Sequence, residues 1–225
     1  MGQILSNYGA LLLTAFGQTL LLALLGLVFG TILGIIFGLL SVLNNKPCKV
    51  IAWIYVNIIR GVPMIVLAMF VYFGVPYAAN NYFNANMTMS SLLAGSICLS
   101  LNCGAYMAEI IRAGIQSVDP GQMEAARSLG MSYWKGMFKV VFPQAIKTMI
   151  PSIVNQFIIT LKDTSILSVI AFPELVNTAK NVIAITFKSF ETWIIVGSMY
   201  LIVILILQYV AKILEKRLNY GRTKR

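Results

Sequence analysis

Histidine is absent from this sequence of 225 residues, and charged residues make up only 11% of it. Without histidine, the chain has neither His-based acid–base catalysis nor histidine metal ligands. Cys48, Cys98 and Cys103 lack a metal-binding spacing, and three cysteines cannot all pair within one chain. Ordinary globular domains carry about 25% charged residues, so this composition indicates a membrane protein.

The charge distribution excludes two further classes of protein. No charged residue precedes Lys46, whereas a secretory signal peptide begins with a positive segment, so we expect the first apolar run to be a retained span. The net charge of +10 would suit a nucleic-acid partner. We expect none, because the positive residues flank apolar runs and form no basic face.

The apolar runs predict an all-α integral membrane protein with five transmembrane helices in a single domain, residues 1–225. A run of about 20 apolar residues crosses a bilayer. We expect spans within residues 10–43, 50–73, 90–111, 147–172 and 192–213, with a polar loop at 76–87. Within the first span Gly26, Gly30, Gly34 and Gly38 form one stripe along the helix, a pattern that favours close helix–helix packing.

The positive residues orient these spans. One group flanks the spans on a common side: Lys46, Lys49, Arg112, Arg127, Lys135, Lys139, Lys147, Lys212, Lys216, Arg217, Arg222, Lys224 and Arg225. The opposite side carries only Lys180 and Lys188. Because positive loops stay in the cytoplasm, the count predicts an N-terminus outside and a C-terminus in the cytoplasm.

Residues 121–151 are the longest polar break between apolar runs, and they carry helix start and stop signals. Asp119 can cap a short helix that begins at Pro120 and ends before Gly130. Ser132 can cap a second short helix, which Pro143 interrupts. The pattern fits an ordinary amphipathic loop or a docking element for a soluble partner.

The same stretch resembles a known family. Glu124, Ala125, Ala126, Gly130 and Phe142-Pro143 resemble the EAA loop of ABC importer permeases. Three flanking motifs resemble the polar amino-acid branch of that family, whose substrates are of the His, Gln, Arg or cystine type: GAYMAEIIR at 104–112, LKDTS at 161–165 and RGVP at 60–63. The last motif has Val62 where the family pattern has Thr.

The resemblance implies a type I ABC importer permease that moves polar amino acids across the plasma (inner) membrane by alternating access. It implies a second permease copy or a sister permease, two ATPase subunits that bind ATP and Mg, and an extracytoplasmic substrate-binding protein. Residues 113–147 would form the cytoplasmic coupling loop. The expected ATPase-coupling residues in it are Gly121, Gln122, Glu124, Ala125, Ala126 and Gly130.

The chain itself shows no catalytic residues, metal ligands or bound cofactor. It lacks the phosphate-binding motif G-x-x-x-x-G-K-[ST], so any ATP hydrolysis is expected on a separate subunit and this chain is not expected to be an enzyme. Two rival functions remain: a secondary amino-acid carrier driven by an ion gradient, and a non-transporting membrane scaffold. The carrier is disfavoured by the lack of an inverted repeat, and the scaffold by the charges within the spans.

Polar residues within the spans are the candidates for a substrate pathway or gate, because intramembrane charges are costly and face a partner or a wet cavity. They are Arg60, Asn102, Glu109, Asn155, Lys162, Asp163, Thr164 and Ser165. A zwitterionic amino acid needs a partner for each of its two charges. Asp163 or Glu109 can accept a hydrogen bond from its ammonium. Arg60 or Lys162 can donate one to its carboxylate. Glu109 and Arg112, three residues apart, can instead form a simple helix pair. A helix break near Thr164-Ser165 would let both Lys162 and Asp163 be solvated.

The orientation can be tested by thiol labelling in sealed cells. Because Cys48 lies next to the positive turn, a membrane-impermeant thiol reagent should reach it only from the cytoplasmic side. A cysteine introduced by Asn84→Cys should react from the outside. The reverse pattern would contradict the predicted topology.

Overall fold

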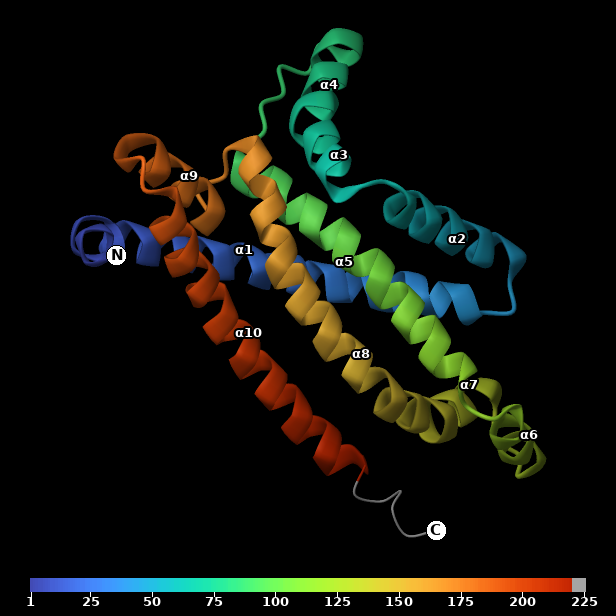
Figure 1. Cartoon of the computed structure of the whole chain (residues 1–225). Helices are drawn as coiled ribbons and strands as arrows, with labels where there is room; N and C mark the ends of the chain where they lie inside the picture. Colours follow the sequence, from blue (N-terminus) through green and yellow to red (C-terminus); the bar gives the residue numbers. More distant parts are fainter. Residues whose placement is uncertain (220–225) are drawn as a thin grey trace.

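The computed structural model describes residues 1–219, so Arg222, Lys224 and Arg225 of the basic tail lie outside the described residues. All regular elements of this part are helical (Figure 1). They are α1 (Gly2–Val42), α2 (Lys46–Gly61), α3 (Met64–Met69), α4 (Val75–Phe83), α5 (Ser91–Gln116), α6 (Pro120–Ser128), α7 (Tyr133–Gly136), α8 (Phe142–Asp163), α9 (Leu175–Thr186) and α10 (Ser189–Asn219).

Five helical segments are long and apolar enough to cross a membrane, as the sequence predicts. They comprise Gly2–Val42, Met64–Phe83, Ser91–Gln116, Tyr133–Ile170 and Ser189–Ile213. In Figure 1, α5, α8 and α10 lie roughly along one axis, with α8 running opposite to its neighbours, and α1 crosses behind them. The short helices α6 and α7 lie at one end of α5 and α8, while α9 lies near the N-terminus.

The contact between α1 and α5 is the most extensive between two helices of the described chain. All four glycines of the predicted stripe are buried in it. A Cβ on Gly26 would lie 2.6 Å from Leu99 Cβ, and one on Gly30 would lie 2.7 Å from Cys103 Cβ. The helices approach this closely because no side chain separates their backbones.

The second predicted span, residues 50–73, is wrong as one continuous helix. The structure divides it after Gly61: α2 ends there, and the membrane-length helix begins at Met64. Val62 is extended, with φ −101° and ψ 129°, because the ring of Pro63 disfavours the helical region for the preceding residue. The expected loop at 76–87 is also wrong in its first part, since α4 continues the helix to Phe83.

Two prolines are accommodated by wide helical turns. The π-helical segment Phe70–Gly74 ends just before Pro76, and the π-helical segment Met137–Val141 ends just before Pro143. Proline has no N–H to donate and its ring crowds the carbonyl four residues earlier, a conflict that a wider turn relieves. Pro143 therefore does not interrupt the chain as predicted, and the helix continues from Tyr133 to Ile170.

The regular α-helix of α8 ends at Asp163, where the sequence predicts a break, and Thr164–Ile170 form a 3₁₀ helix. Side-chain hydroxyls explain this change locally. Thr164 Oγ1 donates to the Leu161 carbonyl at 2.7 Å, and Ser165 Oγ donates to the Lys162 carbonyl at 2.7 Å. Such bonds compete with the backbone ladder at the end of a helix.

The glycine contact can be tested by adding volume. Gly30→Leu or Gly34→Leu should lower the melting temperature or the yield of the purified protein, because the added side chain meets Cys103 or Met107 on α5. The expected loss is about 1–3 kcal/mol or more, as for overpacked cores. Gly17→Leu is the matched control, since a Cβ there meets nothing within 4 Å. Equal stability in all three variants would refute the packing role.

Candidate functional site

A cavity of about 440 Å³ lies where α2 breaks, between α5 and α8. Its polar lining comes from Arg60, Asn102, Tyr106, Gln156 and Asp163. Asn102 Nδ2 donates to Asp163 Oδ2 at 3.2 Å, which ties α5 to the end of α8. The cavity therefore holds one guanidinium and one carboxylate at the level where two helices lose their regular form.

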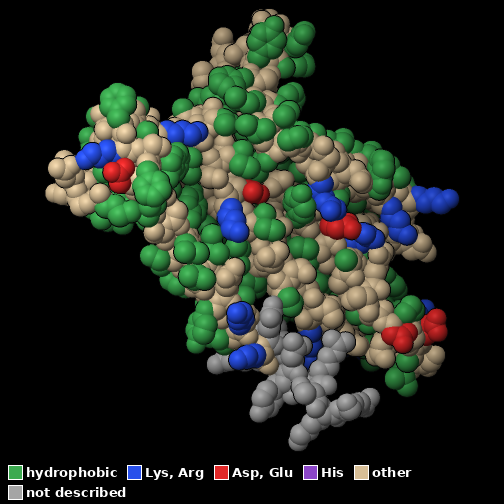
Figure 2. Space-filling model, viewed as in Figure 1, with side chains coloured by type: hydrophobic (Ala, Val, Ile, Leu, Met, Phe, Trp, Pro, Cys, Tyr) green, Lys and Arg blue, Asp and Glu red, His purple; other side chains and the backbone are tan. Residues whose placement is uncertain are grey.

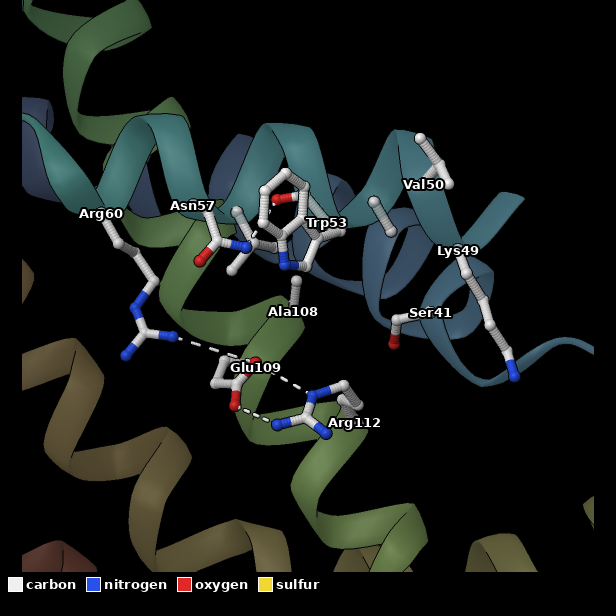
Figure 3. Close-up of a pocket in the computed structure, with 11 residues that line it drawn as sticks. Ser41, Lys49, Val50, Trp53, Asn57, Arg60, Ala108, Glu109 and Arg112 are labelled. Carbon is white, nitrogen blue, oxygen red and sulfur yellow. Dashed lines mark hydrogen bonds and ion pairs between the residues drawn. The ribbon is translucent and has the colours of Figure 1, made fainter. Parts of the chain in front are cut away.

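A second cavity of about 580 Å³ opens between α2 and α5 and shares Arg60 with the first (Figure 3). Glu109 accepts hydrogen bonds from Nε and Nη2 of Arg112, and Arg112 Nη1 donates to Gln116 at 2.7 Å. The predicted pair of Glu109 and Arg112 is thus present. Arg60 Nη1 lies 3.8 Å from Glu109 Oε2 on the other side of the carboxylate.

The two arginines differ in how their donors are used. Arg112 has hydrogen bonds from all three of its guanidinium nitrogens, whereas the Arg60 guanidinium stacks 5.0 Å from the centre of the Tyr106 ring and pairs loosely with Glu109. Five N–H donors are available on each guanidinium. Arg60 therefore keeps donor capacity at the boundary of both cavities.

The structure brings together four of the predicted pathway residues, Arg60, Asn102, Glu109 and Asp163. The other four predicted residues do not line either cavity. Lys162 and Asn155 are exposed, Thr164 is buried, and Ser165 is half-buried and bonded to the backbone. Adjacent residues of a helix point about 100° apart, which explains why Asp163 lines the cavity and Lys162 does not.

The stretch at the other end of α5 consists of the short helix α6 and a turn into α7, which is the first turn of the long helix that continues to Ile170. The Asp119 side chain accepts from the Gly121 N–H at 2.8 Å, and the Ser132 side chain accepts from the Lys135 N–H at 3.4 Å. Gly130 has φ +79°, a conformation that favours glycine, and it reverses the chain between α6 and α7. Both predicted caps and the predicted glycine turn are present.

Within this turn the three residues of the E-A-A pattern face different surroundings. Glu124 and Ala125 are exposed, whereas Ala126 is buried beside Gly136, where an added Cβ would lie 3.3 Å from Ala126 Cβ. Ala126 thus allows close approach within the chain. Arg127 Nη1 donates to the Met131 carbonyl at 3.0 Å, which closes the end of α6.

Comparison with known proteins identifies the family. Residues 30–220 match the model of the binding-protein-dependent transport system inner membrane component. The chain belongs to this family. The permease is 36% identical over 169 residues to the glutamine transport system permease protein GlnP of Escherichia coli K12, covering 75% of each chain. It is 40% identical over 174 residues to the probable glutamine ABC transporter permease protein GlnM of Bacillus subtilis, covering 77% of each.

Solved structures agree with the fold. A chain in the crystal structure of an amino acid ABC transporter with histidines superposes with a TM-score of 0.86 and 37% identity, covering 95% of the permease and 96% of that chain. A chain of the inward-facing MetNI methionine ABC transporter has a TM-score of 0.77 at 17% identity, covering 92% and 96%. The permease therefore has the type I ABC importer fold and is a multi-pass membrane protein, and neither rival function is favoured.

The sequence does not single out several polar residues that the structure places in the cavity or in the buried core. Tyr106 and Gln156 line the smaller cavity. Glu174 is fully buried at the start of α9, where it accepts from the N–H groups of Val176 and Asn177. Burial raises the pKa of the Glu174 carboxyl, although these N–H groups and Tyr200 act against the shift. A glutamate at the start of an apolar helix is a signal that sequence reasoning can use, because its charge is favoured at the positive end of the helix dipole.

The cavity predicts different consequences for two adjacent charges. Asp163→Asn should raise the KM for transport about tenfold or more, because a neutral amide in the cavity can no longer accept a charge-assisted hydrogen bond from the ammonium of an amino acid. Lys162→Gln should change KM less than about twofold, as expected for an exposed charge outside the cavity. Uptake kinetics of the reconstituted transporter measure both. Equal effects in the two variants would contradict this assignment of the cavity.

Proposed function

We propose that the permease forms the membrane pathway of an ATP-driven importer for polar amino acids. The single observation that carries this proposal is the smaller cavity, which presents the Arg60 guanidinium and the Asp163 carboxylate together. A zwitterionic amino acid needs a donor for its carboxylate and an acceptor for its ammonium. Relatives named for glutamine and arginine transport, and a solved amino acid ABC transporter, support this class of solute.

The charged cavities lie on an open face of the helices. Figure 2 shows Lys, Arg, Asp and Glu side chains in the middle of this face, with apolar side chains around them. Charges inside a membrane face a partner or a water-filled space, because lipid exposure is costly. We therefore assign this face to a second permease, either an identical copy or a sister chain, so that the two together enclose the pathway.

The turn formed by α6 and α7, within residues 113–147, is assigned to ATPase coupling. Its outer surface combines the carboxylate of Glu124 with Leu129, whose side chain is 80% exposed. An apolar anchor beside a charge suits a groove in a soluble protein. The cap at Asp119 and the buried Ala126 hold the turn as a unit, which is what transmission of motion into the spans requires.

The remaining partners follow from the orientation predicted by the positive residues. The turn of α6 and α7 lies in the cytoplasm, where two ATPase subunits bind ATP and Mg and carry out hydrolysis. A substrate-binding protein delivers the amino acid at the opposite, extracytoplasmic face. ATP closes the ATPase pair, the coupling turns of the two permeases move together, and the pathway opens outward.

Glu124→Ala tests the coupling assignment. Removing one member of a charged contact buried in a groove costs about 2–5 kcal/mol, so the variant should insert normally but retain its ATPase weakly on co-purification. Gly130→Val should have a similar effect, because a β-branched residue at φ +79° strains the turn. Co-purified ATPase and ATP-dependent uptake are the two readouts.

Glu191→Ala is the matched control, because it removes a carboxylate from the first turn of α10, at the end of the molecule away from α6. This variant should bind the ATPase as the wild type does. If Glu124→Ala and Gly130→Val also keep wild-type binding and uptake, the α6–α7 turn does not dock the ATPase.

A further inference from the structure

A pair of glutamines joins the coupling turn to the base of α8. Gln144 Nε2 donates to Gln122 Oε1 at 3.1 Å, which connects the first turns of α6 and α8 across 22 residues of sequence. The same nitrogen donates to the Val140 carbonyl at 3.0 Å. One amide nitrogen has two hydrogens, and both therefore have acceptors.

This pair spans the place where the helix is irregular. Between α7 and α8 the chain forms the π-helical turn Met137–Val141, directly followed by Pro143. Single π-turns inside α-helices are frequent at functional sites. Along the chain, this turn separates the α6–α7 region from α8, whose far end carries Asp163 of the smaller cavity.

Apolar packing supports the same connection on the inner side. Met123 of α6 packs against a buried cluster that contains Met137, Val141, Ala145 and Met149. The glutamine pair lies on the exposed side of this contact. The buried packing lies on one side of the π-turn and the amide hydrogen bond lies on the other. Both link α6 directly to the start of α8, in addition to the chain that connects them.

We infer that Gln122 and Gln144 are positioning residues that transmit movement of the coupling turn to α8. Gln144 holds the π-turn through Val140 and holds α6 through Gln122, so α6, the turn and the first turn of α8 move as one body. This role rests on the proposed ATPase coupling and goes beyond it. It predicts that breaking the pair at Gln144, which lies outside the residues assigned to ATPase coupling, uncouples ATP hydrolysis from uptake without releasing the ATPase.

The test uses isosteric variants in the complete transporter, reconstituted with its ATPase and its binding protein. Gln122→Met or Gln144→Met should each lower the amino acid imported per ATP hydrolysed by about three- to tenfold, the size of effect expected from one lost hydrogen bond. The double variant should be no worse than either single variant, because the two act through one interaction. Gln208→Met on the exposed face of α10 makes the same chemical change elsewhere and should keep the wild-type ratio.

One further measurement separates transmission from simple folding. In a protein with Cys48→Ser, Ser152→Cys places a thiol on α8; its labelling rate should change between the ADP-bound and ATP–vanadate states. Gln144→Met should abolish that change while co-purified ATPase and basal hydrolysis persist.

Failure of this role is distinct from failure of the proposed function. If the wild type neither binds an ATPase nor imports an amino acid, the proposed function fails. If the wild type does both, three results each overturn the role of the pair: a wild-type import ratio in both methionine variants, multiplicative losses in the double variant, or a wild-type labelling change at Ser152→Cys in Gln144→Met.

Discussion

The close contact between α1 and α5 is the constraint on which the rest of the structure depends. Gly26, Gly30, Gly34 and Gly38 let the α5 backbone lie directly against α1, and α5 carries Asn102, Glu109 and Arg112. In a bilayer, helices gain little from a hydrophobic driving force, so tight packing of small residues supplies the association. Once α5 is fixed, one of its faces lies in the core and the other presents its polar residues to α2 and α8.

At the polar face of α5, each carboxylate has a hydrogen-bond or ion-pair partner. Glu109 lies between two arginines, and Asp163 accepts from Asn102. All three guanidinium nitrogens of Arg112 donate hydrogen bonds, whereas Arg60 stacks on Tyr106 and keeps more of its donors at the junction of two cavities. The break after Gly61 places Arg60 there, because Pro63 ends α2 and turns the chain into the next helix.

The sequence predicts much of this because the deciding signals are local. Apolar runs locate four of the five membrane helices, the period of four locates the glycine stripe, and Asp119, Ser132 and Gly130 define the turn of α6 and α7. The second span was misplaced because Pro63 and Pro76 give the same local signal, yet one breaks the helix and the other is absorbed by a π-turn. Which proline breaks a helix depends on tertiary packing.

The candidate site depends on contacts between distant segments, so the sequence could select its residues only by their polarity within the spans. It lists Lys162 beside Asp163, and only the direction of each side chain separates them. It includes Asn155 but omits Tyr106, Gln156 and Gln144, because polarity alone does not show which neutral residue has a partner. Hydrogen bonds across 22 or 61 residues cannot be read from spacing alone.

The most direct measurement is uptake of labelled polar amino acids into proteoliposomes that contain the permease, with the ATPase and the binding protein added or withheld. The account predicts uptake against a gradient only when both partners and ATP are present, and no uptake driven by a proton or sodium gradient alone. Uptake that persists without the ATPase under an ion gradient would contradict it and identify a self-sufficient carrier.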